Sequence, residues 1–177
     1  MAQYHQYKHD HDSLYKHLHY LVSSKTVLKK TSGEYKDALI GDYENGLMHG
    51  YGEVEYSNGA TYEGQFRDNL IHGHGALRYA NGDYYVGQFE KAKMAGVGLL
   101  THVKGDRFQG TFVDDEIVKG IFKDPRGNHY EGEFKSWMFH GEGVYTTEQG
   151  DVYKGQFEQG TLSGPGEHIL SDGGRYV

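Results

Sequence analysis

The side chains best suited to chemistry in this sequence are histidines that recur two residues apart. Three such pairs occur: His9 with His11, His17 with His19, and His72 with His74. Two histidines at this spacing on a strand face the same way and could begin a metal site. Neither a third nor a fourth ligand accompanies them at a regular spacing, so we expect no resident metal. We predict a structural role for His72 and only adventitious metal binding by the N-terminal pairs.

Catalytic chemistry finds equally little support. The chain has no cysteine, which excludes a thiol nucleophile, a disulfide and a zinc–thiolate site. Its serines do not stand in the pattern of a nucleophile elbow, and its carboxylates are scattered as on a solvated surface. Gly-x-Gly recurs, but never between a strand and a helix as a phosphate-binding loop requires. We therefore predict a protein that is not an enzyme and that uses no cofactor.

The dominant feature of the sequence is a 23-residue repeat. Aromatic-x-Gly-x-aromatic recurs at this period, with one step of 22 residues, and the copies begin at Leu39 (weaker), Tyr62, Tyr85, Phe108, Tyr130 and Tyr153. A fixed period of this length is typical of an array of small stacked units. The predicted units span 39–61, 62–84, 85–107, 108–129, 130–152 and 153–175.

Each unit is predicted to be a β-hairpin. The opening aromatic, glycine and aromatic residues alternate with polar ones, as in Tyr62-Glu63-Gly64-Gln65-Phe66, and so share one face of a strand. A second strand carries the Gly-x-Gly pair, for example Gly73 and Gly75. Asn58-Gly59 and Asn81-Gly82 indicate tight turns, because both residue types tolerate positive φ. Another turn is expected near the seventh residue after the first aromatic, as at Asn69.

Six such hairpins predict an all-β fold, an elongated, twisted, single-layer antiparallel sheet of about twelve strands and about 55 Å. One face would be lined by aromatic residues and glycines, and the other would be polar. The aromatic side chains either hold the hairpins together or bind a partner. The candidate partner-binding residues on this face are Tyr62, Phe66, Tyr85, Phe89, Phe108 and Phe112.

The fourth unit departs from the pattern. It lacks the first glycine of the Gly-x-Gly pair, reading Val118-Lys119-Gly120, and is one residue shorter. We place the missing residue in the turn after Asp115. Either the array tolerates this drift, or it bends or is specialised at this unit.

Composition limits the classes of partner. Residues 39–177 carry 12 Lys or Arg against 21 Asp or Glu, a formal charge of −9, whereas residues 1–38 carry six Lys against four Asp or Glu, a charge of +2. An acidic array is a poor surface for nucleic acid or anionic lipid. No apolar stretch approaches the ~20 residues that span a bilayer, and no signal or transit sequence is recognisable. We expect a cytoplasmic protein.

Residues 62–84 carry the family resemblance. Their aromatic and glycine positions closely resemble the MORN (membrane occupation and recognition nexus) repeat, and the resemblance covers 39–176. It implies a scaffold or adaptor built as an elongated antiparallel sheet. MORN arrays occur in ciliary and flagellar axonemes, protist cytoskeletal scaffolds, junctional tethers, myosin-binding adaptors and lipid kinases. The kinase and methyltransferase domains that accompany some arrays have no counterpart of sufficient length here.

Residues 1–38 form a Tyr/His-rich head that differs from the repeats. Asp12-Ser13 can cap a helix over 13–23, and Val27 to Tyr35 suggests a strand that shields the edge of the first repeat. The helix either packs on the sheet or docks on a larger partner. Its apolar stripe, a further candidate partner-binding set, is Leu14, Leu18, Leu21 and Val22.

The other end of the array begins a seventh unit. Tyr176 lies 23 residues beyond Tyr153, and the strand that contains it is expected to be an exposed edge. Edge pairing with another chain, or end-to-end pairing of two copies, would use this strand, so Tyr176 completes the candidate partner-binding residues.

Three functions remain open. The favoured one is a non-enzymatic scaffold in a large cytoskeletal assembly, placed by the resemblance in the axoneme of a cilium or flagellum. A second is a lipid-binding module, for which only the head supplies lysines: Lys8, Lys16, Lys25, Lys29 and Lys30. The third is a subunit of another complex, such as a protist organelle scaffold.

Overall fold

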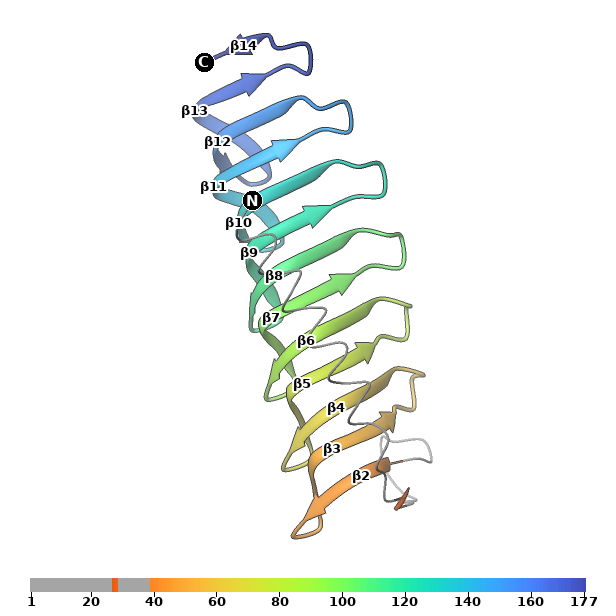
Figure 1. Ribbon diagram of the computed structural model, residues 1–177. Helices are drawn as coiled ribbons and strands as arrows, with labels where there is room; N and C mark the ends of the chain where they lie inside the picture. The colour runs from red at the N-terminus through yellow and green to blue at the C-terminus, as the bar shows by residue number, and fades with distance from the viewer. Residues whose placement is uncertain (1–26, 29–38) are drawn as a thin grey trace.

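A computed structural model describes residues 27–28 and 39–177, all of which except the turns lie in one antiparallel sheet. The sheet has 14 strands, and every strand pairs with its neighbours in the sequence, in the order β1 to β14. It forms an elongated, twisted ribbon a single layer thick (Figure 1). The all-β, single-layer antiparallel fold expected from the repeat is confirmed. The helix expected over 13–23 lies outside the described residues.

Each repeat supplies one hairpin. The hairpins are β2 (Leu39–Glu44) with β3 (Leu47–Glu55), β4 (Thr61–Arg67) with β5 (Leu70–Arg78), β6 (Tyr84–Glu90) with β7 (Lys93–Thr101), β8 (Arg107–Val113) with β9 (Glu116–Lys123), β10 (His129–Lys135) with β11 (Met138–Thr146), and β12 (Val152–Glu158) with β13 (Thr161–Ile169). Short strands lie at the two ends, β1 (Val27–Leu28) beside β2 and β14 (Arg175–Tyr176) beside β13. Of the strand expected over 27–35, only β1 is described.

Two kinds of turn alternate along the array. The strands within a repeat are joined by two residues that both have positive φ, for example Asp68 (50°) and Asn69 (68°). This is the geometry of a type I′ turn, which matches the twist of the strands. Lys91-Ala92 and Ser136-Trp137 adopt it as well, although neither pair favours positive φ.

The strands of successive repeats are joined by five-residue loops, such as 56–60. In that loop the Gly59 amide donates to the Tyr56 carbonyl at 2.9 Å, and the Tyr56 amide donates to the Ala60 carbonyl at 2.8 Å. Only Gly59 has positive φ (89°), whereas the Asn58 side chain accepts a hydrogen bond from the Ala60 amide. The expectation that Asn and Gly share a tight turn with positive φ was therefore wrong: asparagine serves as a side-chain acceptor here.

Each regular hairpin contains a bulge on its second strand. From Gly64 to Phe66 the first strand advances two residues, while its partner runs four, from Gly75 to Ile71. The extra residues include Gly73, whose φ of 63° is left-handed. In this way Ile71 and Gly75 both face the aromatic side of the sheet.

The fourth repeat has a smaller bulge. Gly110 pairs with Gly120 and Phe112 with Ile117, so β9 carries one extra residue where the other repeats carry two. The turn Asp114-Asp115 has the same two-residue form as the others. Our placement of the missing residue in the turn after Asp115 was wrong. The residue lost is the left-handed glycine of the bulge, because the turn needs two residues to close whereas a bulge can vary in length.

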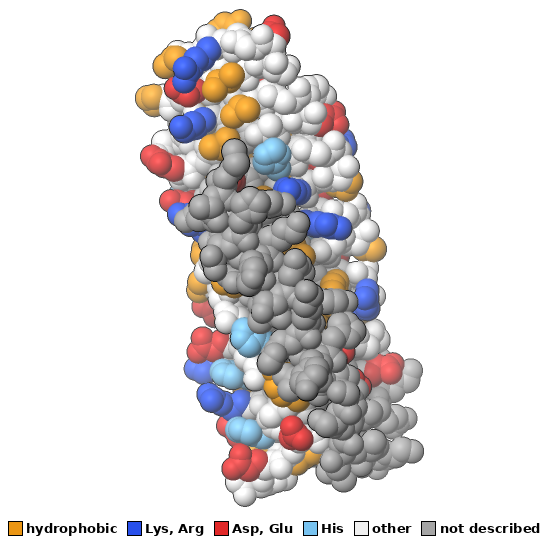
Figure 2. Space-filling view, in the orientation of Figure 1, with side chains coloured by type: hydrophobic (Ala, Val, Ile, Leu, Met, Phe, Trp, Pro, Cys, Tyr) orange, Lys and Arg blue, Asp and Glu red, His pale blue; other side chains and the backbone are white. Residues whose placement is uncertain are grey.

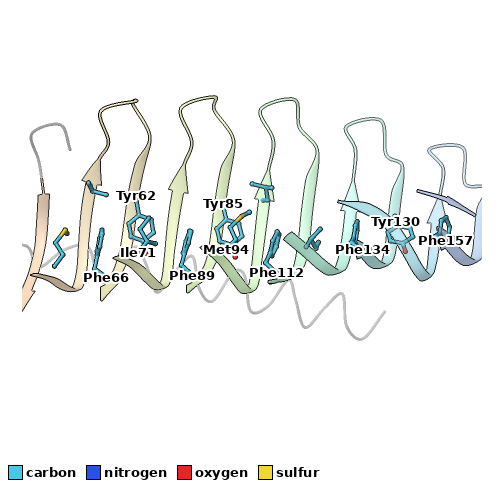
Figure 3. Close-up of a cluster of buried hydrophobic side chains, with 14 residues drawn as sticks. Tyr62, Phe66, Ile71, Tyr85, Phe89, Met94, Phe112, Tyr130, Phe134 and Phe157 are labelled. Carbon is cyan, nitrogen blue, oxygen red and sulfur yellow. The ribbon is translucent and has the colours of Figure 1, made fainter. Parts of the chain in front are cut away.

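The core follows the aromatic face. Its rings meet edge to face from one repeat to the next, as Tyr62 meets Phe89 at 5.4 Å and Tyr85 meets Phe112 at 5.2 Å between ring centroids. Figure 3 shows these side chains in succession along the sheet. Aromatic pairs favour this arrangement, and each pair adds about 0.5–1.5 kcal/mol beyond the area it buries.

Candidate functional site: an aromatic strip and groove

In three repeats the ring of the opening tyrosine lies against the glycine pair of its own hairpin, a placement that we call tucked. A Cβ added at Gly75 would meet the Tyr62 ring, and equivalent contacts join Gly98 to Tyr85 and Gly143 to Tyr130. The paired glycines therefore provide the space in which each ring lies. The Tyr62 hydroxyl then donates to the Gln65 carbonyl at 2.8 Å, and Tyr130 makes the same bond to Glu133 at 2.9 Å. Burial raises the pKa of Tyr130 to about 12, so its hydroxyl stays a donor.

In repeats two and three, a second contact closes the bulge beside the tucked ring. The Gln65 side chain accepts a hydrogen bond from the His74 amide at 2.7 Å, and Gln88 accepts one from Val97 at 3.0 Å. His74 thus contributes its backbone amide to the bulge. In the described residues, no group of three or more His, Asp or Glu side chains is arranged to hold a metal ion. The remaining histidine pairs, at 9–11 and 17–19, lie outside the described residues.

The opening ring is not tucked in repeats four and six. In repeat four the residue is Phe108, which has no hydroxyl, and its ring packs instead on Phe122 (4.9 Å) and Trp137 (5.3 Å). The atoms nearest to a Cβ at Gly110 or Gly120 belong to the backbone and not to this ring. The shortened bulge and the missing hydroxyl therefore occur together in one repeat.

In repeat six the bulge contains Pro165, which lacks the amide that Gln65 and Gln88 cap in their repeats. The Gln156 side chain instead donates to Glu142 at 3.3 Å. Leu162 lies beside the glycine pair, and the Tyr153 ring stacks on His168 at 4.1 Å with an interplanar angle of 14°. The Tyr153 ring is thereby left half-buried at the surface.

Half-buried side chains, all but one of which are rings, form a strip on the aromatic face. Its members lie on the side of the face that borders the five-residue loops, and all are of intermediate exposure. We call this set the aromatic strip: Tyr56, Leu77, Tyr79, His102, Phe108, Phe122, Tyr145 and Tyr153.

The strip widens into a groove over repeats four to six. The groove has a volume of about 600 Å³ and is lined mainly by apolar side chains, Phe122, Phe139, Tyr145, Tyr153, Phe157 and Leu162. Hydrophobic side chains are visible at this end of the molecule among scattered charges (Figure 2). Aromatic residues in such a hollow are the kind of anchor that dominates binding energy in protein interfaces.

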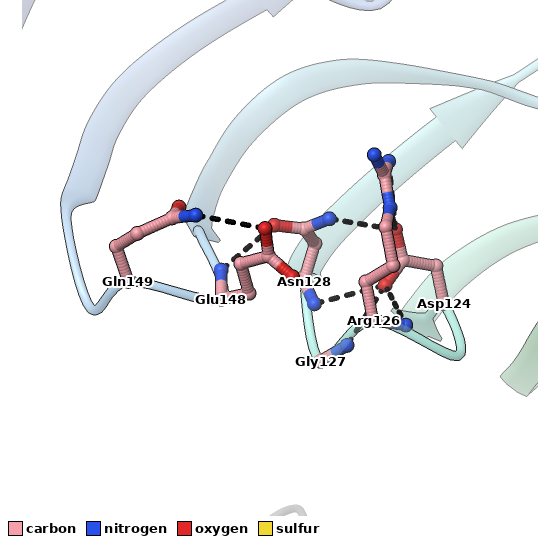
Figure 4. Close-up of polar contacts among 6 residues, drawn as sticks. All are labelled: Asp124, Arg126, Gly127, Asn128, Glu148 and Gln149. Carbon is pink, nitrogen blue, oxygen red and sulfur yellow. Dashed lines mark hydrogen bonds and ion pairs between the residues drawn. The ribbon is translucent and has the colours of Figure 1, made fainter.

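A loop with several internal hydrogen bonds borders the groove. The Asp124 carboxylate accepts hydrogen bonds from the amides of Arg126, Gly127 and Asn128 at 2.9–3.0 Å (Figure 4). The Asn128 side chain also donates to Asp124 at 2.7 Å, and this contact is the main cause that lowers the pKa of Asp124. Asn128 in turn accepts from the Glu148 amide in the next loop at 2.7 Å. The loop thus holds Arg126, whose side chain is 73% exposed, at the rim of the groove.

The predicted site residues divide into three groups. Tyr62, Phe66, Tyr85, Phe89 and Phe112 belong to the buried core, with at most 5% of their surface exposed. Phe108 lies in the strip, and Tyr176 is 62% exposed on β14. Leu14, Leu18, Leu21 and Val22 lie outside the described residues.

Sequence reasoning missed most of the groove. Phe122 and Tyr145 occupy the same position on the second strand of successive repeats, directly opposite Tyr130 and Tyr153. The same position is aliphatic in the earlier repeats, at Val54, Leu77 and Leu100. This change from aliphatic to aromatic was the available signal.

The chain belongs to the MORN-repeat family. The family model matches residues 40–61, 62–84, 85–107, 130–152 and 153–175. Residues 108–129 are not matched, yet they form the same hairpin. MORN repeats suggest a protein-interaction or membrane-binding module. Within the described residues, no helix has the length and apolar character needed to cross a membrane.

No curated protein matches the chain. Among solved structures, it resembles the SAS-4 (dCPAP) TCP domain of Drosophila melanogaster, solved in complex with a proline-rich motif of Ana2 (dSTIL). The identity is 16%, the match covers 86% of this chain and 88% of that one, and the TM-score is 0.48.

Proposed function

We propose that this chain is a non-enzymatic adaptor that binds a partner protein through the aromatic groove of repeats four to six. The observation that carries the proposal is the release of Phe108 and Tyr153 from the tucked position that Tyr62, Tyr85 and Tyr130 occupy. The released Tyr153 ring lines the groove, and Phe108 packs on Phe122, which also lines it. The groove fits a segment with bulky apolar side chains, and the exposed Arg126 at its rim favours a neighbouring carboxylate.

The setting we propose is a cytoskeletal assembly, with the axoneme of a cilium or flagellum as its specific form. MORN membership and an array that presents one continuous aromatic face support it. The formal charge of −9 over residues 39–177 favours a protein partner over an anionic membrane.

The test compares tyrosines on the two faces of the sheet. Tyr145→Ser with Tyr153→Ser alters the groove, whereas Tyr51→Ser with Tyr84→Ser removes two half-buried tyrosines from the opposite face. We expect affinity purification from cells to lose a defined set of proteins only with the groove variant, while both variants keep the β-sheet signal in circular dichroism. Identical protein sets from the two variants would contradict the groove as the binding site.

The purified protein sets also test the setting, and a separate flotation experiment tests the lipid alternative. Axonemal proteins among the groove-dependent set would support the axoneme, and their absence would remove that setting while keeping the adaptor. Flotation of the full chain with phosphoinositide vesicles tests membrane binding. Binding that is lost on neutralising Lys8, Lys16, Lys25, Lys29 and Lys30 would favour the lipid function.

A further inference from the structure

The strip over repeats one to three differs from the groove over repeats four to six. Its apolar members there are Tyr56, Leu77 and Tyr79, which are half-buried and pack against the core. Acidic groups accompany them: the pKa of Tyr79 is raised to about 12, first by burial and then by the charges of Asp115 and Asp83. This part of the strip therefore combines apolar rings with negative charge, and suits an apolar segment that carries positive charge.

One segment of the chain itself has that character. Residues 13–26 contain Lys16 and Lys25 and no Asp or Glu. Leu14, Leu18, Leu21 and Val22 recur there at the spacing of one helical face. An amphipathic helix that lays its apolar side into a hydrophobic groove is a recurrent mode of recognition.

The position of β1 gives this segment access to the strip. Val27 and Leu28 pair with Ile40 and Leu39 at the edge of the first repeat, so the preceding residues start beside β2. Eleven residues in a helix would extend about 16 Å, and three extended residues would add about 10 Å. Strands are about 4.8 Å apart, so this length reaches about five strands, to β6 or β7. That span includes Tyr56, Leu77 and Tyr79 and ends before the groove.

We propose that residues 14–22 of the head bind the strip over repeats one to three as an intramolecular ligand. The apolar stripe contacts Leu77 and its neighbours, while Lys16 lies near Asp83. The two halves of the aromatic face then have different occupants: the chain's own head on the first half and a partner protein in the groove.

The absence of cysteine from the sequence allows a direct test in the full chain. Leu18→Cys or Leu21→Cys is combined with Leu77→Cys, and the matched control combines the same head cysteine with Ala76→Cys. Ala76 and Leu77 are adjacent on β5 and point to opposite faces, so the two pairs differ only in the face that they probe. Oxidation at low protein concentration is followed by mass spectrometry of the intramolecular disulfide.

We expect a disulfide to Leu77→Cys that forms at least tenfold faster than the one to Ala76→Cys. Adding Lys16→Glu should slow it, since this change leaves the array sequence intact but reverses a charge of the segment. Equal rates for the two faces, disulfides formed only between chains, or no effect of charge reversal would each overturn the proposal. Such a failure would not contradict the proposal that a partner protein binds the groove, because that proposal is tested separately by purification with Tyr145 and Tyr153 altered.

Discussion

At the scale of single residues, the tucked tyrosine that opens a repeat links the two strands of its hairpin through ring packing and a hydroxyl hydrogen bond. The Tyr85 ring is fully buried against Gly87 and Gly98, and its hydroxyl donates to the Gln88 carbonyl at 3.0 Å. The hydroxyl thus satisfies a carbonyl at a bulge, where the regular ladder of backbone hydrogen bonds is interrupted. Tyr153 retains the residue type but not this contact.

Tyr85→Phe is therefore expected to lower the free energy of unfolding by about 0.5–1.5 kcal/mol, the usual net value of one hydrogen bond. Tyr153→Phe is the matched control and should change it by less than about 0.5 kcal/mol, because its ring stacks on His168 at the surface. Urea unfolding followed by circular dichroism measures both. Equal losses for the two variants would show that the hydroxyl bond contributes nothing specific.

The sequence predicted which residues share the aromatic face but not which of them are buried. Tyr62 and Tyr153 occupy the same position in the repeat and are followed by similar residues. Their partner strands differ at the bulge, where one repeat has His74 and the other has Pro165. The sequence difference that accompanies the two placements thus lies twelve positions away, in the presence or absence of one amide.

At the scale of elements, the glycine pairs set how closely the two strands and the tyrosine approach. Gly64 pairs with Gly75, and a Cβ on Gly75 would overlap the Tyr62 ring. Glycine at these positions permits this close packing, because no other residue leaves that space. The type of each turn was not predictable, since Ser136-Trp137 adopts a geometry that its residues do not favour.

Gly75→Ala should therefore destabilise the array by about 1–3 kcal/mol, since an added methyl group in a filled site displaces a buried ring. Gly174→Ala is the control, because its Cβ would meet mainly the mobile end of Leu170, at 3.0 Å, and the Asp172 side chain at 3.2 Å. Thermal unfolding of both variants gives the comparison. A Gly75→Ala chain as stable as the control would refute the role of glycine as space for the tyrosine.

The five-residue loops are joined to one another by side-chain acceptors. Asp83 accepts a hydrogen bond from the Val103 amide at 2.9 Å, and the same link joins Asp151 to Ser171 at 2.8 Å. The bond from Val103 is the first cause that lowers the pKa of Asp83. Asn128 occupies the equivalent position in its own loop and accepts a hydrogen bond from the Glu148 amide, so a side-chain amide oxygen can replace the carboxylate as acceptor.

Asp83→Asn is expected to keep the link but lose the charge. A carboxyl group with a lowered pKa in the folded state stabilises that state fully above its unfolded pKa, about 3.9, and loses this effect as the pH falls through the folded value. The variant should therefore be less stable than the natural chain at neutral pH, by about 0.5–1.5 kcal/mol. Urea unfolding at neutral pH and at a pH below the folded pKa of Asp83 should show that the difference in stability between the two chains disappears in acid. A difference that persists in acid would contradict the charge effect.

At the scale of the whole molecule, the array is least regular between repeats four and five. The second turn residue of other repeats docks on the preceding repeat, as the Asn69 amide donates to Met48 and the Ala92 amide to Ile71. Among the described residues, no such bond joins the Trp137 amide to Ile117. Trp137 instead packs its ring on Phe108. In a linear array each unit contacts only its neighbours, so this junction is not reinforced from elsewhere.

Restoring the regular repeat should strengthen this junction. A glycine inserted between Val118 and Lys119, combined with Phe108→Tyr, restores both the bulge and the missing hydroxyl. We expect the two changes together to be more stabilising than the sum of each alone, with a coupling of about 1 kcal/mol in a double-mutant cycle. Additive effects would show that bulge and hydroxyl are independent.

The bulge also bears on how such chains diverge. Loss of one residue from an ordinary strand turns every following side chain to the opposite face. Here the shorter fourth repeat still pairs Gly110 with Gly120 and Gly120 with Gly132, and Tyr130 keeps its place on the aromatic face. Mutations that delete or insert a residue at a bulge are therefore absorbed within one hairpin. Related genes can accumulate such length changes during evolution while every later repeat preserves its orientation.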